Sequence, residues 1–439
     1  MAFTDLDIWM NGQYVGQWFW TRTGTPGLHY DAAWTQSPNA RPLSVSLPLP
    51  AGGGDVIGAK VEHYFDNLLP DSSRIRERLR RRFAAPSTRA ADLLAAIGRD
   101  CVGAVQLVPA GTHPPKHDEI DSTPLTDAQV EAVIQDASND SPDEHSIAHD
   151  FRISIAGAQE KTALLRLGGR WHLPQGATPT THIFKLPLGL IGNMRADMTD
   201  SVENEWLCAQ LLTELGFDAA PTDMMQFGRQ KVLVVERFDR QSMDAGRWIA
   251  RLPQEDFCQA NGWPGDLKYE SDGGPGIRSG FALLASSNKS RADSLQFALT
   301  QLAFWLLAAT DGHAKNFSIF LERGGGYRMT PLYDVLSAWP IIGNGPNQVN
   351  PRQAKLAMAL RSKNAHYTLH EIQTRHWQTL AQQSGVPDAF DSMVALVLQV
   401  PDALERMAAQ LPEGFPAKVW RPVRAGMLAQ TQKFLDNMP

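Results

Sequence analysis

Short apolar runs separated by turn residues dominate the first part of the chain, over residues 5 to 110. One of these runs ends at Asn11-Gly12, a dipeptide that is typical of tight β-hairpins. From about residue 61 to residue 94 the spacing of the apolar positions becomes helical. The pattern therefore predicts a small α+β region at the start of the chain.

The next stretch, residues 111–150, is rich in Pro, Asp, Ser and His. Thr126 stands before Asp127-Ala128-Gln129-Val130-Glu131, as an N-cap residue stands before a helix. Segments of this composition offer little apolar surface to bury. We interpret the stretch as a linker that contains one helix.

The remaining pattern begins with strands and becomes mainly helical. It predicts strands at 161–167, 182–186 and 232–235, a helix at about 201–215, a buried helix at 296–309 and a hairpin from 317 to 333. This order is typical of a two-lobed, protein-kinase-like α+β fold. The predicted parts are an N-terminal α+β subdomain (1–110), the linker (111–150), a nucleotide-binding N-lobe (151–240) and a mainly helical C-lobe (241–439).

Composition agrees with a globular protein of more than one lobe. The 439 residues exceed the size at which a single core usually stops growing, and 43% of them are hydrophobic. No apolar run approaches the roughly 20 residues that cross a bilayer, and the start lacks the basic region of a signal peptide. We therefore expect a cytoplasmic protein that does not contact membranes. The three cysteines are spaced like neither a disulfide framework nor a zinc site.

Charge limits the function classes further. The net charge of −6 argues against a free-standing nucleic-acid binder, because neutralised phosphates supply most of such affinity. Six arginines nevertheless fall between Arg74 and Arg82. On a helix such a run is usually a solvated face, and otherwise a patch for an acidic partner or a phosphate.

Candidate chemistry centres on Asp311, Asn316 and Asp334. Phosphoryl transfer needs a carboxylate beside the attacking hydroxyl and metal ligands beside the phosphates, and kinases supply them as an Asp, an Asn five residues later and a second Asp downstream. The three residues follow this order, and the hairpin that turns at Gly324-Gly325-Gly326 would bring Asn316 opposite Asp334 around one Mg²⁺. The alternative is a turn at Asp311, a capping Asn316 and a solvated Asp334.

An ATP site also needs a cation on the phosphates. Lys185 lies in a predicted strand, with Glu203 or Glu205 as its candidate partner. The segment Glu236-Arg237-Phe238 follows another strand and is a candidate adenine contact through its backbone, with Phe238 lining the pocket. The segment from Ser154 to Lys161 is a candidate phosphate loop, although it has one glycine where G-x-G-x-x-G has three.

Several of these segments resemble the HipA family of serine/threonine kinase toxins from bacterial toxin–antitoxin modules. Ala309-Thr310-Asp311-Gly312-His313-Ala314-Lys315-Asn316 and Thr330-Pro331-Leu332-Tyr333-Asp334 are similar to motifs of that family. Further similar segments are 151–165, 178–182 and 269–276, with 46–49, 65–71 and 98–100 in the N-terminal region. The resemblance covers most of the chain and is weakest in the linker and the last sixty or so residues.

The resemblance implies an ATP- and Mg²⁺-dependent serine/threonine kinase. It makes Asp311 the catalytic base, Asn316 and Asp334 the metal ligands, and Ser154 an autophosphorylation site whose phosphate switches the enzyme off. The nucleotide-binding residues that it implies are Ala156, Gly157, Ala158, Gln159, Glu160, Lys161, Lys185, Glu236, Arg237, Phe238, His313, Lys315, Asn316, Tyr333 and Asp334.

The same resemblance implies partners. They are a HipB-like helix-turn-helix antitoxin, operator DNA bound by that complex at the nucleoid, and a protein substrate, in this family often an aminoacyl-tRNA synthetase. Phosphorylation of such a target would arrest growth and induce persistence. Arg375 and His376 would form a minor DNA contact.

Two other functions remain open from the sequence. One is a catalytically idle co-repressor scaffold, and the other is a small-molecule phosphotransferase with the same Asp, Asn and Asp logic.

Overall fold

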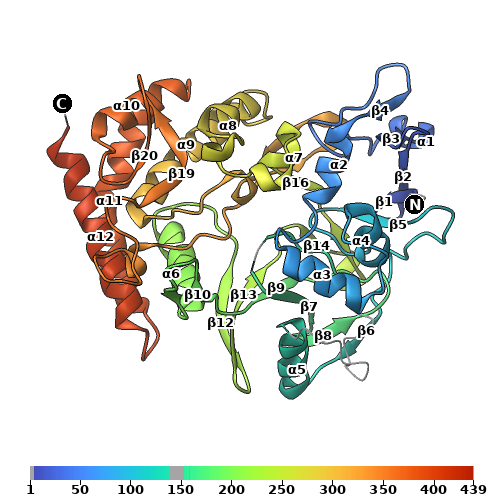
Figure 1. The fold of residues 1–439 in the computed structure, drawn as a ribbon, viewed down its shortest axis with the longest axis horizontal. Coiled ribbons are helices and arrows are strands. Elements are labelled where there is room, and N and C mark those ends of the chain that lie inside the picture. Colours follow the sequence, from blue (N-terminus) through green and yellow to red (C-terminus); the bar gives the residue numbers. More distant parts are fainter. Residues whose placement is uncertain (1–3, 139–152, 158, 439) are drawn as a thin grey trace. The chain divides into compact units, whose positions relative to one another are not determined.

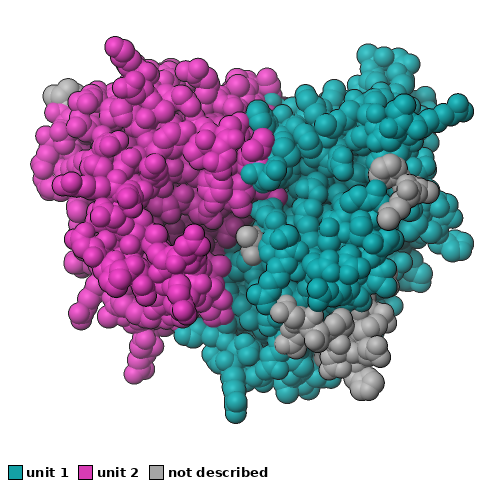
Figure 2. All heavy atoms as spheres, in the orientation of Figure 1, with its two compact units in different colours: residues 1–186, 225–266, 318–327 teal, residues 187–224, 267–317, 328–439 magenta. Residues whose placement is uncertain are grey.

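The computed structural model describes residues 4–138, 153–157 and 159–438 (Figure 1). Its contacts divide the chain into two compact units (Figure 2). Unit 1 consists of residues 1–186, 225–266 and 318–327, and unit 2 of residues 187–224, 267–317 and 328–439. Both units are discontinuous in sequence, whereas the predicted boundaries at 110, 150 and 240 follow the chain. Those boundaries remain a proposal.

The first part of unit 1 is a five-stranded sheet in the order β4-β3-β2-β1-β5. Its strands are β1 (Leu6–Met10), β2 (Gln13–Trp20), β3 (Pro26–Tyr30), β4 (Asp55–Ile57) and β5 (Val105–Pro109). β1 pairs with β2 in antiparallel register across Asn11 and Gly12, which both have positive φ. The predicted hairpin is therefore confirmed.

Helices cover this sheet and share a core with it. They are α1 (Ala32–Thr35), α2 (Ala59–Asp66), α3 (Ser73–Arg82) and α4 (Ala90–Ile97). Trp18 of β2 stacks on Phe65 of α2 with ring centroids 4.2 Å apart, and both rings are fully buried. Helical periodicity between residues 61 and 94 thus predicted real helices.

A six-stranded sheet follows, in the order β12-β13-β9-β7-β8-β6. Its strands are β6 (Ser122–Pro124), β7 (Lys161–Leu167), β8 (Arg170–Pro174), β9 (His182–Lys185), β12 (Thr222–Phe227) and β13 (Gln230–Glu236). α5 (Asp127–Ser138) shares a hydrophobic core with it through residues such as Val133. Thr126 and Gln129 form reciprocal capping bonds at its start, as the sequence predicted.

Three short segments of unit 1 come from later in the chain. They are β14 (Arg240–Met243) paired with β15 (Trp248–Arg251), then β16 (Gln254–Asp256) with α7 (Phe257–Asn261), and β17 (Ser318–Leu321). β18 (Tyr327–Met329) follows β17 across the glycine turn in the sheet order β16-β17-β18. The predicted hairpin is present, but its second strand ends four residues before Tyr333.

Unit 2 is mainly helical. Its helices are α6 (Ser201–Glu214), α8 (Ile277–Leu284), α9 (Ser290–Leu307), α10 (Thr374–Gln383), α11 (Ala389–Gln410) and α12 (Ala417–Asp436). Two hairpins accompany them, β10 (Gly189–Ile191) with β11 (Ala196–Met198) and β19 (Lys355–Arg361) with β20 (Ala365–Thr368). The sequence predicted α6 and α9 but neither hairpin. Within the described residues, no helix is both long and apolar enough to span a membrane.

Candidate active site

The loop after α9 presents one carboxylate to solvent. The helix ends at Leu307, and the left-handed backbone of the next residue, Ala308 (φ 49°), turns the chain away from the helix axis. The side chain of Asp311 is 62% exposed, whereas the residues from Gly312 to Asn316 are buried. A buried backbone therefore supports Asp311 while its carboxylate remains accessible.

Asn316 and Asp334 lie together in unit 2. The side-chain Nδ2 of Asn316 donates to the carbonyl oxygen of Asp334 over 3.1 Å, across 18 residues of sequence. Asp334 adopts a left-handed φ of 59°, a conformation that aspartate tolerates and that occurs often at functional sites. The two residues meet, as the predicted hairpin requires, although Asp334 lies beyond β18 in an irregular segment.

Two further predicted residues belong to the same neighbourhood. The hydroxyl of Tyr333 donates to the carbonyl oxygen of Lys315 over 2.9 Å. The side chain of His313 is buried, and its Nε2 lies 3.9 Å from Oδ1 of Asp311. Unit 2 therefore brings together all six of its predicted site residues, which are Asp311, His313, Lys315, Asn316, Tyr333 and Asp334.

Sequence reasoning assigned no role to Tyr269. Its hydroxyl donates a short hydrogen bond to Oδ1 of Asp311, and its ring meets His313 edge-on at 5.0 Å. Tyr269 precedes Asp311 by 42 residues. It lies in a segment that resembles the HipA family, and this was the only signal in the sequence that could have drawn attention to it.

In unit 1, the candidate phosphate loop is anchored to the N-terminal region. Ser154 is fully buried, and its hydroxyl donates to the carbonyl oxygen of Leu68 over 2.8 Å. Its backbone N–H donates to the carbonyl oxygen of Asp100 over 3.0 Å. The predicted phosphorylation site is thus inaccessible in this conformation, and its modification requires the loop to move.

The single glycine of this loop occupies a position that requires it. Gly157 has a φ of 108°, and a Cβ there would lie 2.6 Å from Nζ of Lys161. Lys161 donates to the carbonyl oxygen of Ala156 over 2.7 Å, and Gln159 donates to that of Leu186 over 2.5 Å. The loop is therefore closed locally by its own side chains. The predicted nucleotide-binding residue Ala158 lies outside the described residues.

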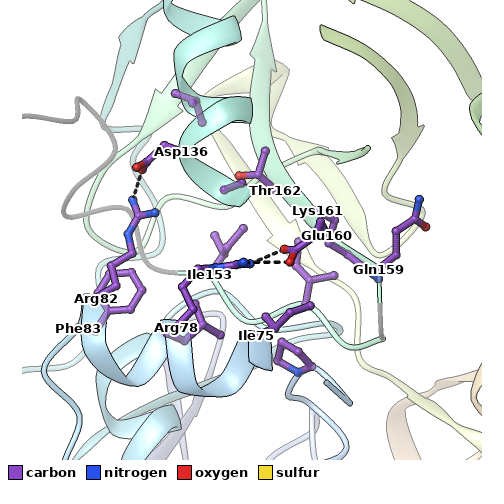
Figure 3. A pocket seen from close by; sticks show the side chains of 15 residues that line it. Ile75, Arg78, Arg82, Phe83, Asp136, Ile153, Gln159, Glu160, Lys161 and Thr162 are labelled. Atoms are coloured by element: carbon purple, nitrogen blue, oxygen red, sulfur yellow. Dashed lines mark hydrogen bonds and ion pairs between the residues drawn. The ribbon is translucent and has the colours of Figure 1, made fainter. Parts of the chain in front are cut away.

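α3 also holds the loop, through a bidentate ion pair between Arg78 and Glu160 (Figure 3). The Arg78 side chain is 10% exposed and that of Glu160 is 31% exposed. One turn later, Arg82 pairs with Asp136 of α5 over 2.8 Å. Both pairs line a pocket of about 80 Å³. Arg76 also pairs with Asp66 of α2 over 2.6 Å, so the run of six arginines is not simply a solvated face: three of its members bind other elements of unit 1.

Strand pairing places two lysines side by side in the six-stranded sheet. The register of β7 and β9 makes Lys161 the direct partner of Lys185. Lys185 is buried. Like charges directly opposite each other on a sheet are unfavourable unless each has a partner, and Lys161 donates to the carbonyl oxygen of Ala156. Glu203 and Glu205, the predicted partners of Lys185, are buried residues of unit 2.

The segment after β13 divides into exposed and buried side chains. Glu236 is exposed, and the Phe238 ring meets Phe320 edge-on at 5.7 Å. The Arg237 side chain is buried and pairs with Asp239 over 2.9 Å. The backbone N–H of Arg237 donates to the carbonyl oxygen of Thr181 over 2.9 Å, so only the carbonyl oxygen of Arg237, which also accepts from Arg240, could take part in the predicted adenine contact.

Arg237 belongs to a buried charge cluster with Asp100, Asp239, Arg240 and Arg251. Asp100 accepts from Arg240 at 2.9 Å and from Arg251 at 3.1 Å. Burial alone would raise the pKa of Asp100, but the three guanidinium groups lower it well below its usual value. Burial also lowers the pKa of Arg240, to about 10. The cluster joins the N-terminal region to the strands after β13.

The predicted DNA contact is weakened by the surroundings of His376. Its ring is buried, stacks on His366 with centroids 4.0 Å apart, and accepts the backbone N–H of Gln373 at the start of α10. Burial, with a smaller contribution from His366, lowers its pKa to about 4. A buried, neutral ring adds no charge toward a phosphate, so Arg375 alone of the two is exposed and charged.

Comparison with known proteins identifies the fold and then the family. The structure of a HipA, HipB and operator DNA complex from Shewanella oneidensis MR-1 contains a chain with a TM-score of 0.79 to this one, at 24% identity, covering 98% of this chain and 97% of that chain. The mixed α+β fold is therefore that of HipA.

Sequence comparison gives the same family. The "HipA N-terminal domain" matches residues 6–108, and the "HipA-like C-terminal domain" matches residues 153–410. The chain is 35% identical over 395 residues to "Putative kinase Y4mE" of Sinorhizobium fredii, covering 88% of this chain and 87% of that protein. It is 28% identical over 425 residues to the serine/threonine-protein kinase toxin HipA of Shewanella oneidensis, covering 93% and 90%. The chain belongs to the HipA family.

Proposed function

We propose that this chain is an ATP- and Mg²⁺-dependent serine/threonine protein kinase and the toxin of a type II toxin–antitoxin system. Its substrate is a component of translation, with an aminoacyl-tRNA synthetase as the first candidate, and its action arrests growth and induces persistence. It phosphorylates its own Ser154 and thereby inactivates itself. With a HipB-like antitoxin it acts as a co-repressor at operator DNA in the bacterial cytoplasm.

One observation carries the catalytic part of this proposal. Asp311 is exposed at the end of a buried segment, while Asn316 and Asp334 meet beyond it in the same unit. An accessible carboxylate suits the base that accepts the proton of an acceptor hydroxyl. The relatives that are named kinases support this assignment.

The donor atoms near Asn316 fit Mg²⁺. Because Nδ2 of Asn316 donates to Asp334, the side-chain oxygen is the atom that can face a cation, and the carboxylate of Asp334 supplies a second oxygen. Mg²⁺ is commonly held by one or two such protein oxygens together with substrate phosphates. The phosphates of bound ATP would complete the coordination.

The paired lysines of unit 1 fit the phosphates of ATP. Lys161 and Lys185 are direct partners across β7 and β9, and kinases carry the lysine that contacts the phosphates on a strand. When bound, Mg²⁺–ATP would supply the transferable phosphoryl group and shield its charge. We propose that Ala156 to Lys161 cover the phosphates and that the backbone of Glu236 to Phe238 contacts adenine.

The burial of Ser154 supports the proposed self-inactivation. A phosphate adds nearly two negative charges, which a fully buried position beside Leu68 cannot accommodate. The phosphorylated loop would therefore leave its place and remove the phosphate-covering residues from the nucleotide site.

The partner part of the proposal rests on the Shewanella oneidensis complex. That structure contains HipA with HipB and operator DNA, and its HipA chain has the fold described here. The net charge of −6 suits a chain that reaches DNA mainly through a basic partner. Arg375 is proposed as a minor contact.

Phosphate transfer tests the kinase activity directly. Purified chain would be incubated with Mg²⁺ and γ-labelled ATP, and the label located by mass spectrometry, with the Asp311→Asn variant as control. The proposal expects label on Ser154 with the wild type and none with the variant. If neither protein transferred label, kinase activity would be refuted and the catalytically idle co-repressor favoured.

Brief expression of the wild type or Asp311→Asn, followed by phosphoproteomics, would identify the substrate class. Labelled small molecules without any labelled protein would favour the small-molecule phosphotransferase. The co-repressor hypothesis predicts that operator binding with the antitoxin survives Asp311→Asn and that expression of this chain alone is not toxic.

A further inference from the structure

Tyr269 contacts the residue that we propose as the catalytic base. Its hydroxyl donates to Oδ1 of Asp311, and both residues belong to unit 2. Each oxygen of a carboxylate has two lone pairs, so this bond leaves Oδ2 available to an acceptor hydroxyl. Nε2 of His313 lies 3.9 Å from the same Oδ1. The oxygen that Tyr269 contacts is thus the one already near other side chains.

An exposed carboxylate is otherwise free to change its direction. The Asp311 side chain is 62% exposed, and exposed side chains exchange rotamers within nanoseconds. A catalytic base must lie within about 2.6 to 3.2 Å of the hydroxyl proton that it accepts. A group that fixes the carboxylate therefore increases the fraction of productive encounters.

The segment that carries Tyr269 is itself held in place. The carbonyl oxygen of Lys268 accepts the N–H of Ala314 over 3.2 Å, which joins the segment to the loop of Asp311. Glu270 accepts the N–H of Ala359 over 2.7 Å and pairs with Arg361, which joins the segment to β19. Tyr269 is thus anchored on both sides.

Close packing inside the segment restricts it further. The N–H of Gly274 donates to the carbonyl oxygen of Tyr269 over 3.0 Å. A Cβ at Gly274 would lie 1.8 Å from the carbonyl oxygen of Leu267, so no larger residue fits there. The Tyr269 ring also meets His313 edge-on. These contacts define the position of the hydroxyl independently of Asp311.

We infer that Tyr269 is a positioning residue for the proposed base, holding Oδ1 of Asp311 so that Oδ2 faces the acceptor hydroxyl. This inference rests on the proposed kinase function. Tyr269 itself is not a phosphate acceptor, because its hydroxyl is held on the oxygen that the acceptor does not use.

Tyr269→Phe removes the hydroxyl and keeps the ring against His313. Transfer would be measured from γ-labelled ATP to the Asp311→Asn chain, whose Ser154 serves as the acceptor, at varied ATP concentrations. Loss of one orienting hydrogen bond should lower kcat about tenfold and leave the KM for ATP unchanged. The matched control is Tyr14→Phe, which removes a tyrosine hydroxyl that donates to Asp7 over 3.3 Å in unit 1 and should leave both constants unchanged.

The outcomes separate this inference from the kinase proposal. Active wild type with unchanged kcat in Tyr269→Phe would overturn the role of Tyr269 and leave the kinase proposal standing. Phosphate on Tyr269 in the wild type would also overturn it, because the hydroxyl would then be an acceptor.

A second measurement does not depend on catalysis. In a double-mutant cycle on urea unfolding, Tyr269→Phe and Asp311→Ala should be non-additive, because the two side chains share one hydrogen bond. Additive effects on the free energy of unfolding would overturn the role of Tyr269, whether or not the wild type transfers phosphate. Absence of phosphate transfer by the wild type would refute the kinase proposal, but not the hydrogen bond between the two side chains.

Discussion

The two loops at the centre of the proposed function are built differently. In unit 2, the loop of Asp311 follows directly from a long buried helix, and its carboxylate is exposed. In unit 1, the loop of Ser154 contains a single glycine. Leu68 and Arg78, which lie far earlier in the sequence, hold this loop through hydrogen bonds. Ser154 itself is fully buried.

The two loops therefore differ in how easily each can leave its place, with the loop of Ser154 the easier to release. The anchors of the unit 1 loop are side-chain and backbone bonds from Leu68, Arg78 and Asp100, each of which can break separately. The unit 2 loop also accepts bonds from residues distant in sequence, such as Tyr269 and Tyr333, but in addition every residue from Gly312 to Asn316 is buried. The first loop is therefore expected to open locally at lower free energy than the second. Four predictions test the comparison.

The largest effect is expected on catalysis, from Asp311→Asn. Loss of a general base should lower the rate of phosphate transfer by about 10²- to 10⁴-fold. Because the side chain is largely exposed, the free energy of unfolding should change by less than about 0.5 kcal/mol. Kinetics with labelled ATP and urea unfolding would measure both. The exposed Asp272→Asn is the control, and an equal loss of transfer there would contradict a special role for Asp311.

Asp100→Asn, in contrast to Asp311→Asn, should mainly lower the free energy of unfolding. The change leaves three buried guanidinium groups with the single carboxylate of Asp239, which should cost about 3 to 5 kcal/mol. Urea unfolding followed by tryptophan fluorescence would measure this loss. Asp244→Asn disrupts an exposed pair with Arg247 and should cost less than about 0.5 kcal/mol. Equal costs for the two variants would show that the cluster does not hold unit 1 together.

Glu255 should make unit 1 less stable as the pH rises. Its carboxyl group is buried and accepts the N–H of Val45 over 2.8 Å, and burial raises its pKa from 4.5 to about 8. The unfolded chain loses this proton near pH 4.5, whereas the folded chain keeps it until about pH 8. The contribution of protonated Glu255 to the free energy of unfolding is therefore fully present below pH 4.5 and is lost as the pH rises to 8. The loss is on the order of 4 kcal/mol.

Glu255→Gln tests this pH dependence because glutamine cannot ionise. Unfolding free energies of both proteins would be measured in urea from pH 5 to pH 9. The difference between wild type and variant should shift in favour of the variant as the pH rises. A constant difference would mean that Glu255 does not titrate in this window.

The smallest effect is expected from Arg78→Ala, which removes one anchor of the unit 1 loop. Because Glu160 is 31% exposed, the ion pair should contribute about 1 kcal/mol, equivalent to an opening of the loop about five times more frequent. Amide hydrogen exchange around Ser154 would measure the opening, and labelling of Ser154 in trans should accelerate similarly. The control is Arg81→Ala, since Arg81 pairs with Glu77 of its own helix. Equal exchange in both variants would exclude Arg78 as an anchor.

Local elements were predictable because their signals are local. The Asn11-Gly12 hairpin, the cap of α5 at Thr126 and strand β7 all appear where the pattern placed them, and helix α9 begins at Ser290, six residues before its predicted start. Even the meeting of Asn316 and Asp334 followed from a hairpin of short range. The hairpin of β19 and β20 was missed in a region whose pattern is mostly helical.

The sequence by itself thus determined several local elements, the family and the candidate residues of the catalytic loop. Only the tertiary structure decided which polar side chains meet: Arg78 with Glu160 across 82 residues, Tyr269 with Asp311 across 42, and Arg237 with Asp100 across 137. Periodicity and turn residues act over a few positions, whereas these pairs depend on which side chains lose water together when distant segments pack. For the same reason, the burial of Ser154 could not be predicted from its loop alone.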